Sequence, residues 1–228
     1  MKSHSYSRML DCYRQVKTFV TNCGYENEIK WQDKVRFNDI SESDFLREIA
    51  WVILCSGMRE AVVRKYFRDI SFCFLEWESS EKIVEMRDYC IENAGNYFGH
   101  FKKLEAIVSA AEKIHKAGFQ KIKSVLFESP IETLKTFSFI GPTTAYHLAK
   151  NLGLPFAKAD RHLFRLSSAL GYSDVQDFCN NIAYLSGDSI QVVDIVVWRF
   201  ATLRSDYISV FKNTCAGLLD TGILNTSD

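Results

Sequence analysis

Apolar residues recur at helical spacing along most of the chain. After Pro142, for example, Ala145, Leu148, Ala149 and Leu152 fall on one face of a helix. Strand-like alternation is scarce, and the 228 residues include only three prolines. The pattern therefore predicts an all-α protein. It places helices at about 7–22, 44–56, 58–75, 80–92, 102–117, 130–136, 142–152, 161–170, 174–185 and 188–203.

The turn between two of these helices has the composition of an anion-binding hairpin. Gly141 is the residue where left-handed backbone costs least, and Pro142 suits the first position of a helix. The N–H groups around 140–144 would meet an anion at the positive end of the helix dipole, and Thr143 and Thr144 add hydroxyl donors. Such contacts position a phosphate without reading bases. An ordinary corner between two helices is the alternative.

A single acid follows this hairpin about twenty residues later, in the segment Ala159-Asp-Arg-His-Leu-Phe-Arg165. Asp160 directly precedes the helix predicted at 161–170, so it can act as the N-cap of that helix. It can also present a carboxylate beside a bound nucleic acid, and the two roles are compatible.

These two segments resemble the helix-hairpin-helix DNA glycosylase superfamily. Its hairpin typically reads Leu-Pro-Gly-Val-Gly-x-Lys-Thr-Ala, with another residue in place of Lys in some members, and the matching stretch here is Phe137-Ser-Phe-Ile-Gly-Pro-Thr-Thr-Ala145. Its catalytic segment reads Val-Asp-x-His-Val-x-Arg, which matches Ala159–Arg165, and Leu170-Gly171 follows as it often does in the family. A weaker resemblance spans about Phe45 to Arg204.

The resemblance implies a two-lobed helical fold with a DNA-binding cleft between the lobes. One lobe, at 58–170, would carry the helix-hairpin-helix at about 130–152 and the aspartate segment. The second would combine 1–57 with 171–228. Asp160 would be the catalytic carboxylate, while His162 and Arg165 would orient and cap its segment. The phosphate-binding residues would be Phe139, Ile140, Gly141, Thr143 and Thr144. A structural Na⁺ or K⁺ could bind the backbone carbonyls of Lys135, Phe137 and Ile140; no other cofactor is expected.

The chain departs from the family pattern at two important positions. Phe139 stands where the first hairpin glycine is usual, with Ser138 in place of the preceding proline. Thr143 replaces the lysine that forms a Schiff base in the members that are also lyases, and a covalent imine requires an amine. Lys150 and Lys158 are close in sequence but are more simply read as solvated or phosphate-facing side chains.

The resemblance therefore implies a monofunctional DNA glycosylase that leaves an abasic site. Cleavage of an N-glycosidic bond builds positive charge on the sugar, which one carboxylate can stabilise while it orients water. The target base must first leave the helical stack. Base-pocket candidates, each also explicable as core, are Trp51, Met58, Tyr97, Phe98 and Trp198. The alternatives are a non-catalytic DNA-binding protein, a bifunctional glycosylase/lyase with a displaced lysine, and a helical interaction protein.

Charge and cysteine content refine this picture. The formal net charge is zero, but residues 97–170 hold nine Lys and two Arg against five acids, which favours one basic face toward phosphates. The seven cysteines are scattered and lack the clustered spacing of an iron–sulfur loop, so no such cluster is expected. No signal peptide or membrane span is evident. We expect a monomeric intracellular protein whose partners are double-stranded DNA and a downstream abasic-site-processing enzyme.

Overall fold

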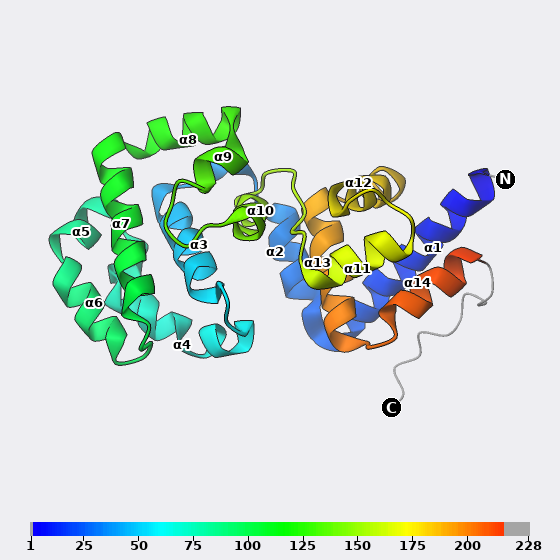
Figure 1. The fold of residues 1–228 in the computed structure, drawn as a ribbon, viewed down its shortest axis with the longest axis horizontal. Helices are drawn as coiled ribbons and strands as arrows, with labels where there is room; N and C mark the ends of the chain where they lie inside the picture. The colour runs from blue at the N-terminus through cyan, green and yellow to red at the C-terminus, as the bar shows by residue number, and fades with distance from the viewer. Residues whose placement is uncertain (1, 217–228) are drawn as a thin grey trace. The chain divides into compact units, whose positions relative to one another are not determined.

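The computed structural model of the chain describes residues 2–216, and every regular element in that range is helical. This confirms the predicted all-α class (Figure 1). The chain divides into two compact units. The middle unit is formed by residues 36–152, and the terminal unit combines the residues up to Val35 with those from Gly153 onward.

The middle unit is built around one apolar helix, α3 (Glu42–Cys55). The side chains of Phe45, Ile49 and Ile53 on this helix are almost fully buried. Ser41 and Asp44 form a capping box that fixes its start, because each side chain accepts a hydrogen bond from the other's backbone N–H. The other helices of this unit are α4 (Glu60–Cys73), α5 (Ser80–Glu85), α6 (Arg87–Gly95), α7 (Phe101–Ala117), α8 (Phe119–Glu128), α9 (Pro130–Leu134) and α10 (Pro142–Asn151).

Helices α4, α7 and α10 all pack against α3, which places the hairpin between α9 and α10 on the central helix of the unit (Figure 1). Two short 3₁₀ turns, η2 (Phe37–Asp39) and η3 (Leu75–Trp77), complete the described elements of this unit.

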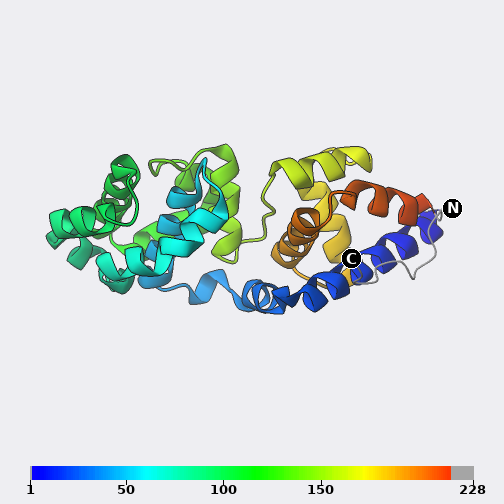
Figure 2. The same ribbon diagram turned by 90° about the horizontal axis from the view of Figure 1, so that it is seen from below.

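The terminal unit brings the two ends of the described chain together. Helix α1 (Lys2–Val20) lies against α13 (Ile190–Leu203) and α14 (Tyr207–Ala216), as both ribbon views show (Figures 1 and 2). A π-helical turn, η1 (Thr21–Tyr25), joins α1 to α2 (Glu26–Lys34), and Gly24 supplies the left-handed φ of 91° that the bend requires. Helices α11 (Arg161–Ala169) and α12 (Val175–Ser186) pack on the same core.

The boundaries of the units differ from the predicted 57/58 and 170/171. Residues 36–57 belong with the middle unit because α3 buries its apolar face there. Residues 153–170 belong with the terminal unit because Leu163 and Leu166 of α11 join the core that contains Val193 and Phe200. The hairpin and Asp160 consequently belong to different units.

Three helices lie where none was predicted. Helix α2 has no apolar stripe, since Ile29 and Gln32 are its only buried residues. Helix α8 begins immediately after Gly118, whose φ of 83° ends α7, and it buries Phe119, Ile122 and Leu126. Helix α14 buries Tyr207 and Phe211, one turn apart. In addition, the helix predicted at 80–92 is interrupted at Met86, which separates α5 from α6.

Candidate active site

The hairpin between α9 and α10 has its left-handed residue at an unexpected position. Phe139 has φ 63°, whereas Gly141 has φ −88° and ψ −175° and is extended. The prediction that Gly141 takes the left-handed conformation was therefore wrong. A left-handed conformation costs a non-glycine residue about 1–2 kcal/mol. The chain thus keeps the backbone of a hairpin glycine at position 139 but adds a benzyl side chain to it.

Hydrogen bonds inside the hairpin occupy two of the predicted phosphate-binding amides. The Ile140 N–H donates to the Phe137 carbonyl at 3.1 Å, and the Gly141 N–H donates to Thr144 Oγ1 at 2.7 Å. Pro142 has no N–H to offer. Across residues 2–216, the backbone N–H groups of Phe139, Thr143 and Thr144 have no protein acceptor. The donors available to an anion are therefore these three amides and the exposed Thr143 hydroxyl.

Side chains from α7 and its N-terminal turn support the hairpin. The Lys113 ammonium donates to the Thr136 carbonyl at 3.2 Å and lies 4.4 Å from the centre of the Phe137 ring. Partial burial lowers the pKa of Lys113. The exposed ring of His100 meets the Phe139 ring edge-on, with ring centres 5.9 Å apart. These contacts help hold the first half of the hairpin.

Asp160 is the N-cap of α11. Its Oδ1 accepts hydrogen bonds from the backbone N–H groups of His162, at 2.8 Å, and Leu163, at 3.0 Å. Its Oδ2 has no hydrogen-bond donor among the described residues, and the side chain is half-buried. The predicted N-cap role is therefore present, and it uses one carboxylate oxygen while leaving the other open.

The backbone just before Asp160 is fixed by two side chains that sequence analysis did not identify. The Ala157 N–H donates to Gln176 Oε1 at 3.0 Å, and the Lys158 N–H donates to Asp194 Oδ2 at 2.6 Å. Asp194 is 1% exposed, although in the sequence it looks like an isolated charge within an apolar helix. These two contacts from α12 and α13 hold the chain that carries the candidate catalytic carboxylate.

His162, two residues after Asp160 on α11, contacts Tyr207 of α14. Their rings meet edge-on with centres 5.7 Å apart, and the buried Nδ1 of His162 has no hydrogen-bond partner in the described part of the chain. Burial raises the pKa of the Tyr207 hydroxyl, and the nearby charge of Asp160 raises it further, while Arg165 and Arg161 lower it. Tyr207, which was not predicted, is therefore within electrostatic reach of Asp160. Arg165 is exposed and makes no capping hydrogen bond or ion pair to any described residue.

The predicted base-pocket residues are distributed over both units. Trp198 lies in the terminal unit and the other four in the middle unit. Met58 and Tyr97 are exposed, with 37% and 44% of their surface accessible, whereas Phe98 is buried at 4%. Trp51 packs edge-on against Phe67. Met58 and Tyr97 are therefore open to a ligand in the middle unit, while Phe98 serves as core.

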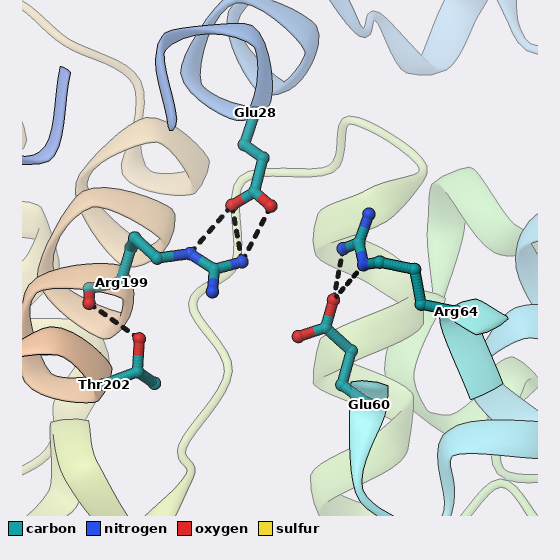
Figure 3. A network of polar contacts seen from close by, with 5 residues as sticks. All are labelled: Glu28, Glu60, Arg64, Arg199 and Thr202. Atoms are coloured by element: carbon teal, nitrogen blue, oxygen red, sulfur yellow. Dashed lines mark hydrogen bonds and ion pairs between the residues drawn. The ribbon is translucent and has the colours of Figure 1, made fainter. Parts of the chain in front are cut away.

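An immobilised arginine lies beside Trp198 in the terminal unit. Nε and Nη2 of Arg199 donate to the Glu28 carboxylate at 2.7–3.0 Å (Figure 3). The guanidinium also stacks on two rings, with its centre 4.2 Å from Tyr25 and 4.5 Å from Trp198. In the middle unit, a separate pair joins Arg64 to Glu60 one helical turn earlier (Figure 3). The Arg199 contacts fix one face of Trp198 and explain why this candidate is only half-exposed.

The lysines that could act as nucleophiles are mostly buried. Lys150 is 4% exposed and Lys103 is 2% exposed. The Lys103 ammonium donates to the carbonyls of Leu54 and Ser56 at 2.7 and 2.6 Å, and burial lowers its pKa. The Lys103 side chain therefore caps the C-terminal end of α3. Lys158 is half-buried, and its backbone is held by Asp194.

No group of three or more His, Cys, Asp or Glu side chains suited to a metal ion occurs within the part of the chain that the structure describes. The Cys215 side chain lies outside that part. At the hairpin, the Phe137 carbonyl already accepts the Ile140 N–H, but a carbonyl oxygen has a second lone pair, so a monovalent cation remains compatible with the predicted carbonyl set. None of the described helices is both long and apolar enough to cross a membrane.

Comparison with solved structures finds a similar helical fold. A similar structure is the 8-oxoguanine glycosylase/lyase of Methanocaldococcus jannaschii, in complex with a 15mer DNA containing 8-oxoguanine. The two share a TM-score of 0.55 and 17% sequence identity over 84% of this chain and 97% of that chain. No protein-family model and no curated protein sequence matches the chain. The comparison agrees with the resemblance in sequence at the level of the fold.

Proposed function

We propose that the protein is a DNA glycosylase that hydrolyses the N-glycosidic bond of a damaged, mispaired or modified base. The observation that carries this proposal is the geometry of Asp160. One oxygen of its carboxylate is fixed by two backbone N–H groups while the other has no donor among residues 2–216, in a fold similar to that of a glycosylase/lyase solved on DNA. Asp160 also keeps its sequence context, between the hairpin and the His162–Arg165 segment.

In the proposed reaction the target nucleotide leaves the base stack and its C1′ lies beside Oδ2 of Asp160. The bond between C1′ and the base nitrogen breaks, the base leaves with the bonding electrons, and positive charge develops on the sugar. The carboxylate stabilises that charge and accepts a proton from the attacking water. The water oxygen forms the new bond to C1′, and the proton held by the carboxylate then passes through solvent to the departed base, which leaves an abasic site, the free base and an ionised Asp160.

The absence of an amine at position 143 supports a monofunctional mechanism. Thr143 stands at the first turn of α10, where the resemblance places the lysine of the lyase members, and a hydroxyl cannot form an imine. Lys150 and Lys103 are buried. The named activity of the M. jannaschii protein includes a lyase, so strand cleavage through a displaced lysine is the first alternative to exclude.

A DNA-binding protein without catalysis is the second alternative, and one feature of the hairpin favours it. Phe139 places a ring where backbone would otherwise approach a phosphate, and two of the expected amide donors are used internally. The open oxygen of Asp160 favours catalysis over this alternative. A glycosylase would act as a monomer on double-stranded DNA in the cell interior and pass its product to an enzyme that processes abasic sites.

The decisive experiment measures base release from a panel of duplexes, each carrying one oxidised, alkylated, deaminated or otherwise modified base, including the modified bases of foreign DNA. Strand breaks are read with and without alkali. We expect breaks only after alkali, with wild-type protein and not with Asp160→Asn. Breaks without alkali, together with a protein–DNA adduct trapped by borohydride, would establish a lyase instead. Firm binding without release across the panel would favour the non-catalytic alternative.

A further inference from the structure

Helix α11 has an outer face that its packing does not explain. Its inner face is formed by Leu163, Leu166 and Ser167, each no more than 1% exposed. Arg161, Phe164, Arg165 and Ser168 follow one another at helical spacing on the opposite side, and all are exposed. We call these four residues the α11 outer face. At its centre Phe164 is 61% exposed, so more than half of its surface remains in contact with water.

The two arginines of this face have no ion-pair partner among the described residues. Helix α11 contains no acidic residue, and neither guanidinium forms an ion pair with any residue between 2 and 216. Arg161 Nε donates to His162 Nε2 at 3.3 Å, and its two terminal nitrogens remain open. Arg161 is also the first residue of the helix, where the helix dipole disfavours a cation. Fold stability therefore does not account for these two arginines.

Exposure of one aromatic ring would not by itself indicate a ligand, since Tyr184 on α12 is 89% exposed. Phe164 differs because an arginine lies one turn before it and another directly after it, and because the helix begins at Asp160. Guanidinium groups bind phosphate oxygens in paired hydrogen bonds, and aromatic rings stack on nucleobases. Arg161 and Arg165 are about 6 Å apart along the helix axis, which allows them to contact different phosphates of one strand.

We propose that the α11 outer face binds the DNA strand that carries the target nucleotide, with Arg161 and Arg165 on its phosphates and Phe164 stacked on a base that has lost its neighbour. The inference rests on the proposed function in that it takes DNA as the ligand. It assigns contacts to residues other than Asp160 and the hairpin. The positive charge of the face selects a polyanion over an apolar protein partner.

The test compares binding to two duplexes of one sequence, one intact and one with a single tetrahydrofuran abasic-site analogue. Full-length variants are made in the Asp160→Asn background, so that turnover does not interfere. Arg161→Gln with Arg165→Gln tests the phosphates, and Phe164→Ala and Phe164→Trp test the stacking. Matched controls are Lys30→Gln with Lys34→Gln, two exposed cations of α2, and Tyr184→Ala, an exposed ring of α12. Thermal unfolding verifies that each variant is folded.

We expect loss of the two arginines to weaken binding to both duplexes and to reduce the salt slope of log K by about 1.8, because each phosphate contact contributes about 0.9. Phe164→Ala should leave the slope unchanged and lower affinity for the abasic duplex about 5- to 150-fold, the equivalent of one base–aromatic stack. Phe164→Trp should retain that affinity. The controls should bind as the parent protein does.

Parental affinity and salt slope in both α11 variants would overturn the inference, as would equal losses in the controls. A dimer in light scattering that dissociates on Phe164→Ala would also overturn it, because the face would then be an interface between copies. The results that would overturn the proposed function differ from those that would overturn the inference about the α11 outer face. If no base in the panel is released but the α11 variants lose DNA affinity as described, the surface stands without the catalysis. If base release depends on Asp160 while the α11 variants bind normally, the catalysis stands without the surface.

Discussion

Asp160 is the N-cap of α11 and the proposed catalytic carboxylate, and substitution can separate these two roles. Replacement by alanine removes the oxygen that accepts the His162 and Leu163 N–H groups, and loss of an N-cap typically costs about 1 kcal/mol. Asparagine keeps a side-chain oxygen and is as good an N-cap as aspartate. We therefore expect Asp160→Ala to lower the midpoint of thermal unfolding by about 2–4 °C for a chain of this size, and Asp160→Asn to leave it nearly unchanged.

Catalysis should respond differently, because both variants lose the charge. A positioned acid–base group contributes about 10²- to 10⁴-fold to a rate, so both Asp160→Asn and Asp160→Ala should lose base release by at least about 10²-fold. The assay is single-turnover release from the duplex that the panel identifies, with enzyme in excess. DNA affinity, measured in parallel, should change little.

Two results would refute this reasoning. Base release by Asp160→Asn at the wild-type rate would mean that the carboxylate is not the reacting group. Full activity in Asp160→Asn and loss only in Asp160→Ala would mean that Asp160 serves α11 as a cap and that another residue does the chemistry.

Substitutions at four further residues test the structure. Glu76→Gly should raise the free energy of unfolding by up to about 1 kcal/mol, because Glu76 is held in the left-handed region at φ 51°. Phe139→Gly also removes left-handed strain, but it loses the contact between the Phe139 and His100 rings. Unchanged DNA affinity in Phe139→Gly would show that the Phe139 ring takes no part in binding. Burial raises the pKa of Glu48 in the folded protein above its ordinary 4.5. The protonated Glu48 therefore contributes stability that is fully present below pH 4.5 and is lost as the pH rises through the pKa of the folded state. Glu48→Gln, which keeps an acceptor for Asn151, should flatten that decline in urea unfolding, and identical pH profiles would contradict it. Asp194→Ala should lower the free energy of unfolding by about 1.5–3 kcal/mol. It should also reduce base release further than Asp194→Asn, because asparagine retains an acceptor for the Lys158 N–H. Equal activities in the two variants would show that this contact does not position Asp160.

The sequence predicted the parts of the fold that depend on local periodicity. Helices such as α3, α10 and α13 carry apolar stripes or runs that can be recognised without tertiary information. Helix α2 buries only Ile29 and Gln32, so it carries no such stripe and its sequence did not reveal it. The unit boundaries were misplaced for a related reason. Whether α3 and α11 belong to one core or another depends on contacts with residues far away in sequence.

The candidate site was likewise predictable from the sequence only where it depends on neighbouring residues along the chain. The N-cap role of Asp160 follows from the residue and the helix directly after it, and the structure shows it. Gln176 and Asp194 hold the preceding backbone from helices that begin 15 and 30 residues beyond Asp160, and no spacing rule relates them to it. In the hairpin, the general preference of glycine for left-handed backbone pointed to Gly141. The turn instead imposes that conformation on Phe139, where the sequence offers no glycine.

The two departures from the hairpin pattern act on different parts of the proposed chemistry. At the first turn of α10, the helix dipole would destabilise an ammonium and so favour a neutral, nucleophilic lysine. Thr143 gives up that reactivity and presents an uncharged hydroxyl and an N–H to an anion instead. In the proposed mechanism the hairpin then retains only a binding role, which the Phe139 side chain would restrict further. All of the bond cleavage in that mechanism therefore depends on Asp160, and Asp160→Asn should lose the alkali-dependent strand breaks of the wild-type protein without gaining alkali-independent ones. A residual alkali-independent break in that variant would require an amine elsewhere.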